Sequence, residues 1–461
     1  MTDPTTIPIY FIGYNNSFWI QRMVDQLKKY HMTVVLIDNA STDPQTVEYL
    51  AKEFPYQIIR MDKNYGHTVY DHIIDQLPDL FFLSDPDLDL NSNMPVNFPS
   101  VMLALSEELK ASKVGLALDI SEPELFLKGD YFQGRTIVQW EKQFWTQPIK
   151  SDKYPDLSIY QADIDTTFCL VNKKYYSSGK CYRLADWYTC NHLPWYKDIW
   201  LQYPWRQFDH YYRNSLCSTT VKLFNQTTIM RNFRVSINSP SFAWWKENYS
   251  TWEQSTFVAL DRYLDKDKDF LDIGSWIGLL SYYAARKSRE VYAVECDRGS
   301  LFELKLNDLV NNSRINIIDY AVYKEDGATI WFGPNRFIPK WGNQMNLSVS
   351  QIDTNKSTEL DYPVTTISFN SLIQRCGDNL SAIKVDIEGA EEHILDQILN
   401  YLRTTTTPCI VSFHYTWWRH RKLDQFDFTG IRAETLDQQF LPDVKQWILK
   451  DPFISVVLQK E

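Results

Sequence analysis

Two parts of the sequence repeat the same alternation, in which a short apolar segment ends in a polar or glycine-bearing turn and a helix-like stretch follows. The apolar segments lie at 7–12, 33–37, 58–61 and 80–83 in the first part, and at 270–273, 291–295, 315–318, 382–386 and 409–414 in the second. Strands that alternate with helices form parallel sheets, because a parallel connection needs a crossover of about a dozen residues or more. The sequence therefore predicts an α/β fold with two sheets.

The length of the chain and a polar stretch between the two parts indicate two domains. The chain has 461 residues, and a domain usually has ~100–200. Residues 214–240, between the two series of strands, are polar and rich in Thr and Asn. We place the boundary near residue 238. This predicts domains at 1–238 and 239–461, each of them a Rossmann-like α/β domain.

Charge and composition argue against several classes of protein. The 47 Lys and Arg are outnumbered by 58 Asp and Glu, which gives a net charge of −11 and argues against a nucleic-acid-binding surface. No apolar run approaches the ~18 residues of a membrane span, and Met1–Tyr10 shows no secretory signal. The seven cysteines form no CxxC pair, so we expect reduced thiols and a cytoplasmic location. The sequence does not indicate an oligomeric state.

Polar residues that directly follow strands are candidate site residues, because ligands of open α/β sheets bind outside the carboxyl ends of the strands. Asp38 follows the apolar segment 33–37 and begins the stretch Asp38-Asn-Ala-Ser-Thr-Asp43. Its carboxylate can accept hydrogen bonds from a base or a ribose. The same stretch also suits the start of a helix, with Ser41, Thr42 or Asp43 as the N-cap. The two interpretations are compatible.

A second candidate site follows the apolar segment 80–83. Asp85, Asp87 and Asp89 leave the end of this segment on alternate positions. Carboxylates so close together repel one another unless a cation neutralises them, and a hard divalent ion such as Mn²⁺ or Mg²⁺ would also bridge a diphosphate. The alternative is an acidic surface turn, since Asp-Pro is common in turns.

Two later segments contain further candidates. Asp163 and Asp165 lie within 161–168, and group transfer to a hydroxyl needs one carboxylate to take the hydroxyl proton. His192 lies in the aromatic segment 191–196. It is a candidate metal ligand or phosphate contact, although a single histidine in such a segment is more often structural.

The motifs of the first part resemble a known family. Asp38-Asn-Ala-Ser-Thr-Asp43, Asn64-Tyr-Gly66 and Asp85-Pro-Asp87 are similar to those of the family 2 glycosyltransferases with the GT-A fold. Asp165-Thr-Thr-Phe and His192-Leu-Pro-Trp-Tyr resemble a subgroup of small bacterial and viral members, some of them rhamnosyltransferases. The resemblance covers roughly residues 5–215. A Gln/Arg-x-x-Arg-Trp element, which polymerising synthases contain, is missing, and this favours transfer of a single sugar.

The resemblance implies roles for these residues. Asp38 contacts the nucleoside, and Asn64 belongs to the same nucleotide-binding part. Asp85 and Asp87 hold the ribose and the metal-bound diphosphate. Asp165, or its neighbour Asp163, is then the catalytic base, and His192 is a further metal ligand. The implied cofactors are Mn²⁺ or Mg²⁺ and a nucleotide-sugar donor, such as UDP-rhamnose or a similar compound.

In the second part, a glycine-bearing loop follows a strand and opens a helix. It reads Asp272-Ile-Gly-Ser-Trp-Ile-Gly278, and Gly274 and Gly278 allow the backbone to approach a ligand closely. Glu295 ends the next strand, 23 residues after Asp272, where an acid can hydrogen-bond ribose hydroxyls. Asp319 follows the next apolar segment and is placed to meet an adenine amino group.

The glycine spacing distinguishes two kinds of cofactor. A dinucleotide site requires G-x-G-x-x-G, whereas this loop reads D-x-G-x-x-x-G and places an acid near the ligand. An anionic pyrophosphate suits that acid poorly, while a cationic sulfonium suits it well. The pattern therefore favours S-adenosyl-L-methionine (SAM) as the cofactor.

The second part resembles the FkbM-type SAM-dependent O-methyltransferases over about residues 255–415. The similar motifs are Asp272–Gly278, Glu295-Cys-Asp and Lys384-Val-Asp-Ile-Glu-Gly-Ala-Glu391. One departure is Trp276, where the family usually has Asn, and a bulkier wall near the methionine moiety is one reading of it. Asp386 or His414 could take the proton of the methylated hydroxyl. The alternative for Asp386 and Glu388 is an ordinary solvated strand end.

Together the two resemblances predict a bifunctional transferase of glycan biosynthesis. The first domain transfers a sugar to a glycan acceptor, and the second O-methylates a sugar hydroxyl. The candidate base implies that the sugar transfer is inverting. The alternatives are a glycan-binding module with degenerate sites and a methyltransferase for an unrelated small molecule. Four tryptophans of the second half are candidates for lining an acceptor groove, although core packing is the commoner role for any one of them: Trp331, Trp341, Trp417 and Trp418.

Overall fold

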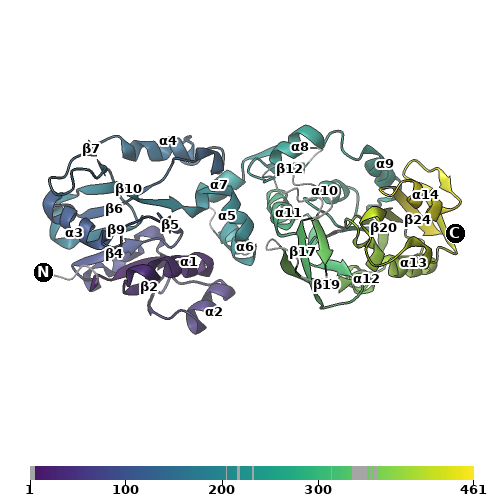
Figure 1. Ribbon diagram of the computed structural model, residues 1–461, viewed down its shortest axis with the longest axis horizontal. Coiled ribbons are helices and arrows are strands. Elements are labelled where there is room, and N and C mark those ends of the chain that lie inside the picture. Colours follow the sequence, from purple (N-terminus) through teal and green to yellow (C-terminus); the bar gives the residue numbers. More distant parts are fainter. Residues whose placement is uncertain are drawn as a thin grey trace. The chain divides into compact units, whose positions relative to one another are not determined.

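The computed structural model describes residues 6–203, 205–214, 219–230, 233–312, 314–334, 350–353, 356 and 361–461. It divides the chain into two compact units, Met1–Gln226 and Thr227–Glu461 (Figure 1). Each unit is built on a sheet with parallel strands at its centre and helices packed on it. The predicted α/β fold class is confirmed.

The N-terminal unit alternates strands and helices through its first half and has a mixed second half. Its strands are β1 (Ile9–Gly13), β2 (Val34–Asp38), β3 (Gln57–Arg60), β4 (Leu80–Ser84), β5 (Leu88–Leu90), β6 (Lys113–Leu118), β7 (Pro148–Ile149), β8 (Ile159–Gln161), β9 (Cys169–Asn172) and β10 (Cys181–His192). Its α-helices are α1 (Ser17–Leu27), α2 (Pro44–Lys52), α3 (Phe98–Leu109), α4 (Ile137–Glu141), α5 (Lys197–Gln202), α6 (Trp205–Asn214) and α7 (Thr219–Phe224).

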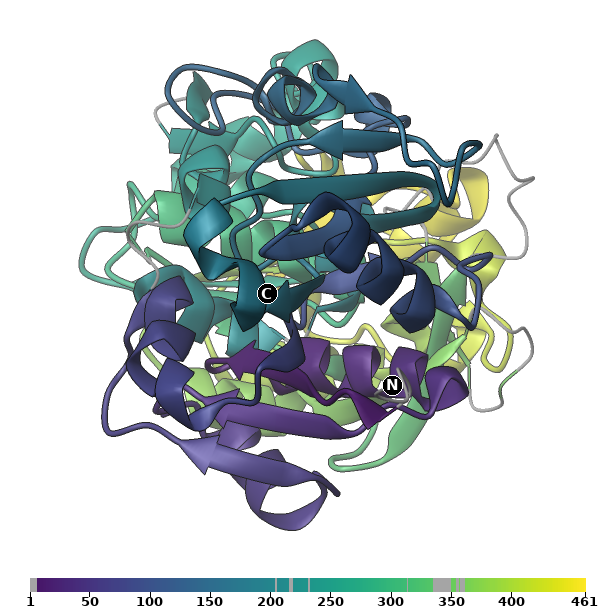
Figure 2. The same ribbon diagram turned by 90° about the vertical axis from the view of Figure 1, so that its left-hand side faces the viewer.

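The sheet of this unit has the order β3-β2-β1-β4-β9-β6-β10-β8-β7. Figure 2 shows the chain from the side on which this unit faces the viewer. The strands β3, β2, β1 and β4 are parallel to one another, and β9 then pairs with β4 in the opposite direction. The chain order reverses between β1 and β4, which is where ligands of open α/β sheets bind. The end of β10 pairs with β5 and places His192 opposite Leu88, so that His192 lies beside the predicted acidic turn.

The C-terminal unit contains the second series of strands and helices. Its strands are β11 (Thr227–Met230), β12 (Phe233–Ser236), β13 (Asp269–Ile273), β14 (Val291–Val294), β15 (Asn316–Ile318), β16 (Ala321–Tyr323), β17 (Thr329–Pro334), β18 (Ser350–Asp353), β19 (Tyr362–Ser368), β20 (Leu380–Val385), β21 (Cys409–Ser412), β22 (Ile431–Thr435), β23 (Phe440–Leu441) and β24 (Ser455–Lys460). Its α-helices are α8 (Phe242–Asn248), α9 (Gln254–Tyr263), α10 (Leu279–Ala284), α11 (Arg298–Val310), α12 (Phe369–Cys376), α13 (Leu395–Thr404) and α14 (Val444–Lys450).

The main sheet of this unit has the order β15-β14-β13-β20-β21-β24-β22-β23. Its first five strands are parallel, and the chain order reverses between β13 and β20. The strand β24 lies antiparallel between β21 and β22, whereas a dinucleotide-binding sheet has six parallel strands. A smaller sheet with the order β16-β19-β17-β18 follows β15.

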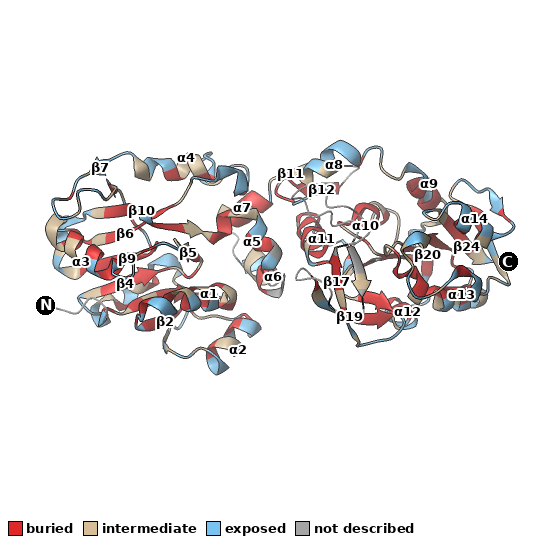
Figure 3. Ribbon diagram, in the orientation of Figure 1, coloured by how far each residue is buried: buried red, intermediate tan, exposed pale blue. Residues whose placement is uncertain are grey.

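The core of the C-terminal unit lies on both faces of the main sheet. Neighbouring residues of one strand belong to different clusters of buried side chains: Leu271 and Ile273 to one, and Phe270 to the other. Because successive side chains of a strand point to opposite faces, this alternation shows a sheet covered on both sides. The central strands are accordingly red in Figure 3, and the outer faces of the helices are pale blue.

The two units meet between Gln226 and Thr227, whereas the sequence places the boundary near residue 238. The residues between these positions form the hairpin β11–β12, which is hydrogen-bonded to α11. Asn307 Oδ1 accepts from the backbone N–H of Ser236 at 3.0 Å, and Asn311 Oδ1 accepts from that of Arg234 at 2.8 Å. The polar stretch in which the sequence analysis placed the boundary therefore includes two strands that pair with each other.

Two further findings concern the composition. Six cysteines among the described residues are free thiols, and Cys217 lies outside the described residues. Among the described helices, none has both the length and the apolar character needed to cross a membrane.

Candidate functional site

In the N-terminal unit, Asp38 ends β2 and is buried in contact with two groups of the protein. Its Oδ2 pairs with Arg60 Nη1 at 2.8 Å, and its Oδ1 accepts from the backbone N–H of Ser41 at 3.0 Å. The helix cap is a different residue, because Asp43 accepts from the N–H of Thr46 at the start of α2. The structure thus places Asp38 at the carboxyl edge of the sheet and assigns the capping role to Asp43.

Asn64 joins the loops that follow β2 and β3. Its Oδ1 accepts from Asn39 Nδ2 and from the backbone N–H of Gly66, both at 2.8 Å. Asn39 Oδ1 in turn accepts from the N–H of Tyr65 at 2.8 Å. Asn64 therefore shapes this edge of the site from an exposed position.

Asp85 and Asp87 follow β4 and lie close enough to affect each other. Burial, together with the charges of Asp87 and Asp165, raises the pKa of Asp85 well above its usual value. The hydroxyl of Thr166 donates to Asp85 Oδ2. Burial also raises the pKa of Asp87, and the charge of His192 opposes this shift. Two carboxylates whose charged forms are disfavoured in this way suit a site that is completed by a cation.

His192 lies against Asp87, with 3.6 Å between His192 Nε2 and Asp87 Oδ2. Asp87 Oδ1 and His192 Nδ1 are buried and have no hydrogen-bond partner among the described residues. Asp85, Asp87 and His192 are not one of the groups of described residues in which three ligand atoms lie within 4.8 Å of one another. The pair Asp87–His192 is therefore brought together, and Asp85 lies beside it with one oxygen held by Thr166.

The two candidate bases differ in their surroundings. Asp165 Oδ1 accepts from the backbone N–H and the hydroxyl of Thr167 at 3.1 and 2.9 Å. Burial opposes ionisation of Asp165, but these hydrogen bonds outweigh it and lower its pKa. The backbone carbonyl of Asp163 accepts from Arg183, and both aspartates are exposed to solvent. Of the two, Asp165 is the one whose charge acts on Asp85.

Sequence reasoning missed the buried ion pair that supports this edge. Arg183 Nη1 lies 2.6 Å from Glu141 Oε1, and both side chains are at most 5% exposed. Burial raises the pKa of Glu141 to about 7, against the charge of Arg183. Removing one partner of such a pair typically costs about 3–5 kcal/mol, because the other charge is left buried. Glu141 is distant in sequence from every motif, so no local pattern indicates the pairing.

In the C-terminal unit, Asp272 and the glycine loop lie where β13 ends. Asp272 is buried; its Oδ2 accepts from the hydroxyl of Ser281 at 2.6 Å, and its Oδ1 has no partner among the described residues. Burial raises the pKa of Asp272, and Lys384 opposes this. Gly274 has a φ of +77°, and a Cβ there would lie 1.8 Å from the Asp386 carbonyl oxygen. The glycine is required for packing between neighbouring strand ends.

Gly278 has a different role from the one expected from the sequence. Its φ is +91°, and a Cβ there would lie 2.4 Å from the Tyr282 ring and 2.7 Å from Leu304. It does not belong to the described residues that line the cavity of this unit. The glycine therefore allows α10 to pack against α11.

Glu295 follows β14 and holds the glycine loop. Its Oε2 accepts from the backbone N–H of Trp276 at 2.8 Å, and its Oε1 accepts from those of Cys296 and Asp297 at 2.7 and 2.8 Å. Burial and the charge of Asp297 raise the pKa of Glu295 to about 8, and the three hydrogen bonds oppose this. Oε2, which accepts a single hydrogen bond from the described residues, is the oxygen with more capacity for a ligand hydroxyl.

Asp319 does not reach the cavity in this structure. Its side chain is 58% exposed and lies 3.5 Å from Lys305 Nζ. The neighbouring residue Tyr320 lines the cavity instead. The sequence places Asp319 at the right strand end, but the ion pair with Lys305 turns its carboxylate away from that edge.

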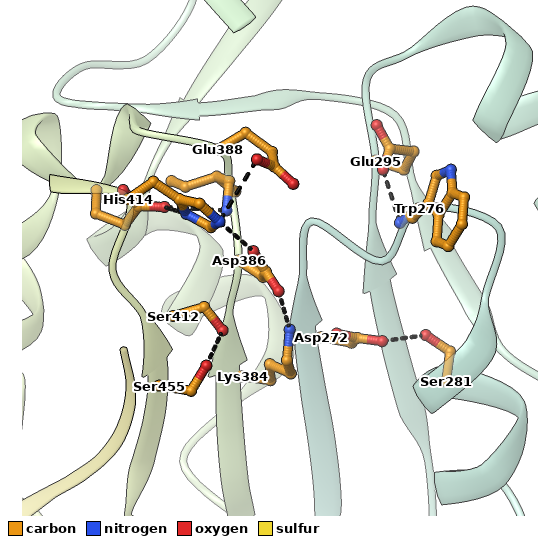
Figure 4. A network of polar contacts seen from close by, with 12 residues as sticks. Asp272, Trp276, Ser281, Glu295, Lys384, Asp386, Glu388, Ser412, His414 and Ser455 are labelled. Atoms are coloured by element: carbon orange, nitrogen blue, oxygen red, sulfur yellow. Dashed lines mark hydrogen bonds and ion pairs between the residues drawn. The ribbon is translucent and has the colours of Figure 1, made fainter. Parts of the chain in front are cut away.

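Lys384 and Asp386 form a buried ion pair at the end of β20 (Figure 4). The distance from Lys384 Nζ to Asp386 Oδ2 is 2.7 Å. Burial opposes protonation of Lys384, but the charges of Asp386, Glu253 and Asp272 outweigh it and raise its pKa. For Asp386, the charges of Lys384 and His414 outweigh burial and lower its pKa. Lys384 is therefore charged and neutralises part of an acidic cluster.

His414 follows β21 and is surrounded by carboxylates (Figure 4). Its Nδ1 lies 3.1 Å from Glu391 Oε1, and its Nε2 lies 3.4 Å from Glu388 Oε2 and 3.6 Å from Asp386 Oδ1. Burial opposes protonation, but the charge and hydrogen bond of Glu391 outweigh it and raise the pKa of His414 to about 9. The imidazole is therefore protonated at neutral pH and is not available as a base.

A cavity of about 340 Å³ connects these groups at the carboxyl edge of the sheet. Asp272, Gly274, Glu295 and Asp386 line it, while His414 lies behind Asp386 and is not among the described residues that line it. Sequence reasoning missed three lining residues that precede β13 in the chain: Trp244, Trp252 and Glu253. They belong to α8 and to the turn before α9, and nothing in their local sequence marks them as a site.

The four tryptophans suggested for an acceptor groove lie elsewhere. Trp331, Trp417 and Trp418 are not among the described residues that line the cavity, and Trp341 lies outside the described residues. Trp417 stacks on the His414 ring with 5.0 Å between centroids, and Trp418 Nε1 donates to Glu391 Oε2 at 3.2 Å. These two residues support the histidine.

Comparisons with known proteins give weak structural likenesses. No protein-family model and no curated protein matches the sequence. An rRNA methylase from Streptococcus thermophilus is 14% identical, with a TM-score of 0.25, and the match covers 45% of this chain and 93% of the methylase chain. S. aureus TarS 1–349 is 12% identical with a TM-score of 0.27, covering 67% and 90%. Phosphoethanolamine N-methyltransferase 2 of Haemonchus contortus with S-adenosyl-L-methionine is 10% identical with a TM-score of 0.24, covering 97% and 84%. We therefore argue function from this chain's own residues.

Proposed function

We propose that this chain is a bifunctional transferase of glycan biosynthesis. The C-terminal unit methylates a hydroxyl with SAM, and the N-terminal unit transfers a sugar from a nucleotide-sugar donor to a glycan acceptor. The observation that carries the proposal is the cavity at the point where β13 and β20 diverge, lined by Asp272, the Gly274 turn, Glu295 and Asp386. This is the location at which α/β sheets of this order bind their ligands.

The residues of the cavity fit SAM. Glu295 is suited to the ribose hydroxyls, and Asp272 Oδ1, buried and without a partner among the described residues, is suited to a cationic group. The antiparallel β24 further separates this sheet from a dinucleotide-binding one. The cofactor would supply a methyl group on a sulfonium, and the carboxylates in the cavity disfavour a pyrophosphate there.

Asp386 and His414 then have different roles in the methyl transfer. Asp386 lines the cavity, and its Oδ1 lies 3.6 Å from His414 Nε2 but has no hydrogen bond from a described residue, so it can accept the hydrogen bond of the acceptor hydroxyl and orient it. His414, protonated and stacked on Trp417, keeps Asp386 ionised from behind. Asp386 is therefore the proposed proton acceptor, and His414 is a positioning residue.

The N-terminal unit supports the second activity. Asp85 and Asp87 lie at the switch point of its sheet, and the charge of Asp87 adds to the cost of ionising Asp85, so the residues fit a divalent cation that neutralises them. Mn²⁺ or Mg²⁺ would bind the diphosphate of the donor there. Asp165, whose charge acts on Asp85 and whose pKa is lowered, remains the proposed acceptor of the hydroxyl proton.

Three measurements on the full chain test the proposal. Calorimetry should show binding of SAM, weakened by about 1–3 kcal/mol in Glu295→Ala through lost charge-assisted hydrogen bonds. A thermal-shift screen with UDP-, GDP- and dTDP-sugars should show a shift only when Mn²⁺ is present. Labelled methyl transfer should favour the glycosylated acceptor over free nucleotide-sugar. Absence of SAM binding would refute the methyltransferase, and methylation of nucleotide-sugar alone would reverse the order of the reactions.

A further inference from the structure

Three tryptophans from three segments meet at one end of the C-terminal cavity. Trp244 lies on α8, Trp252 precedes α9, and Trp276 lies in the glycine loop after β13. The ring centroids of Trp244 and Trp276 are 4.9 Å apart, those of Trp244 and Trp252 6.0 Å, and those of Trp252 and Trp276 6.4 Å. All three rings are half-buried and line the cavity. We call these residues the tryptophan cluster.

Glu253 adds a carboxylate to the tryptophan cluster. It lines the same cavity, and its Oε2 is buried without a hydrogen-bond partner among the described residues. Its backbone is held at a φ of +39°, which is strained for a residue with a side chain. The indole Nε1 of Trp276 is likewise buried and lacks a partner among the described residues. The cluster thus offers one acceptor and one donor that no described residue uses.

The neighbouring Trp245 shows what a core tryptophan looks like in the same helix. It is 1% exposed, and its Nε1 donates to Glu303 Oε1 at 2.6 Å. Buried polar atoms are normally paired, because an unmade hydrogen bond costs about 1–3 kcal/mol. Trp276 Nε1 and Glu253 Oε2 depart from this rule, and both residues line the cavity. This arrangement points to a ligand that forms the hydrogen bonds both groups lack.

We propose that the tryptophan cluster and Glu253 form an acceptor subsite for a pyranose ring, an inference that rests on the proposed methyltransferase function. The C–H face of a pyranose packs on an indole face, and its hydroxyls both donate and accept. A ring hydroxyl donates to Glu253 Oε2, and a ring oxygen or hydroxyl accepts from Trp276 Nε1. A quaternary ammonium ion, the other common occupant of aromatic cages, can accept no hydrogen bond and would leave Trp276 Nε1 unpaired.

The location of the subsite suits its role. Lys384 pairs with Asp386 at 2.7 Å and interacts electrostatically with Glu253, and all three residues line the same cavity. A sugar held on the tryptophan cluster would therefore have a hydroxyl within reach of the Asp386 edge. In this proposal, the Trp276 side chain packs against the sugar, at the position where the resembled family usually has Asn.

Saturation-transfer NMR on the full chain tests the subsite with methyl α-L-rhamnopyranoside as the probe, with and without S-adenosylhomocysteine. We expect signals on the ring C–H protons, and binding weaker by about 2- to 10-fold in Trp252→Ala and Trp276→Phe. Glu253→Gln, which keeps the side-chain volume, should also weaken binding. Trp187→Ala, at a tryptophan that is 56% exposed in the N-terminal unit, serves as the control and should change nothing.

Calorimetry with S-adenosylhomocysteine on the same variants separates the possible failures. If the chain binds S-adenosylhomocysteine but no variant weakens binding of the pyranoside, the subsite alone is overturned. Pyranoside binding that depends on Trp252 and Glu253 without any cofactor binding supports the subsite and overturns the methyltransferase. Signals from tetramethylammonium that are lost in Trp252→Ala, with none from the pyranoside, would assign the cage to a cation and overturn the sugar. In a methylation assay, the KM for the acceptor should rise while that for SAM is unchanged.

Discussion

Gly274 packs against the backbone of Asp386 so closely that a Cβ at position 274 would lie 1.8 Å from the Asp386 carbonyl oxygen. The two residues follow β13 and β20, which are neighbouring strands at the switch point of the sheet. The glycine therefore sets the distance between two strand ends that both contribute to the cavity. The effect of this contact on stability can therefore be measured without a ligand.

Gly274→Ala should destabilise the C-terminal unit and abolish SAM binding. The substitution adds both a strained φ of +77° and a collision with backbone that cannot rotate away. Gly430→Ala is the control, because its φ of +75° is similar but a Cβ there meets nothing within 4 Å. We expect Gly430→Ala to lower the free energy of unfolding by about 1–2 kcal/mol and Gly274→Ala by clearly more. Equal losses in urea titrations would contradict the backbone collision.

Asp87→Asn should abolish sugar transfer without destabilising the fold. Burial raises the pKa of Asp87, so ionised Asp87 is unfavourable in the unliganded chain, and the neutral amide removes this cost. We expect an unchanged or higher melting temperature together with a loss of transfer of at least about 100-fold. Asp89→Asn is the control, since Asp89 pairs with Arg22 at 3.4 Å.

The measurement is release of sugar from UDP-, GDP- and dTDP-sugars at fixed Mn²⁺, with EDTA as a second arm. Transfer by Asp87→Asn at the wild-type rate, or an unaltered rate in EDTA, would show that Asp87 holds no metal.

The pH dependence of stability should report the buried charge of His414. Its pKa is raised to about 9 in the folded chain, against an unfolded value of about 6.5. The stabilisation is therefore fully present below about pH 6.5 and is lost as pH rises towards 9. At most it amounts to about 3 kcal/mol. His414→Gln should flatten the decline in the urea midpoint between pH 6.5 and 9.

Glu388 titrates in the same direction and must be separated from His414. Burial raises its pKa to about 8, so it also favours the folded chain at low pH and loses that contribution as pH rises from its unfolded value near 4.5. A Glu388→Gln variant isolates this part. If His414→Gln leaves the decline in the urea midpoint unchanged and Glu388→Gln removes it, the pH dependence comes from titration of Glu388 and not of His414.

Fragment boundaries test the division of the chain. Residues 227–461 should fold and bind SAM, whereas residues 239–461 should not, because they lack the β11–β12 hairpin. Without that hairpin, Asn307 and Asn311 of α11 lose the hydrogen bonds that they make to Ser236 and Arg234. Circular dichroism and calorimetry on the two fragments provide the comparison. A stable, SAM-binding 239–461 would move the boundary to residue 238.

The sequence predicts strand ends far better than it predicts partners across the fold. Asp85 and Asp386 directly follow apolar strands, and Asp272 lies one residue before the end of β13. Parallel strands bring their carboxyl ends to one edge, so the sequence predicts all three positions. Asp319 was placed by the same rule, but its orientation depends on Lys305, which lies on a helix that the rule does not consider. Strand position is therefore a local property, while side-chain direction depends on tertiary contacts.

Glu253 and Trp244 are cavity residues that the sequence does not indicate. They precede β13 in the chain, lie in α8 and in the turn before α9, and line the cavity through tertiary packing. Likewise, His414 was taken as a possible base, since its sequence position says nothing of the three carboxylates that raise its pKa. Contacts between residues so far apart leave no periodic signal in the chain.

The strand β24 has a consequence for how the chain is made. It lies between β21 and β22, and it spans Ser455–Lys460. The sheet of the N-terminal unit is complete once His192 has emerged from the ribosome, so that unit can fold during synthesis. The C-terminal sheet cannot close until residue 460 is free, and until then β22 and β21 present unpaired edges to other chains. A premature stop shortly before Ser455 would therefore yield a chain with a complete N-terminal sheet and an aggregation-prone second unit.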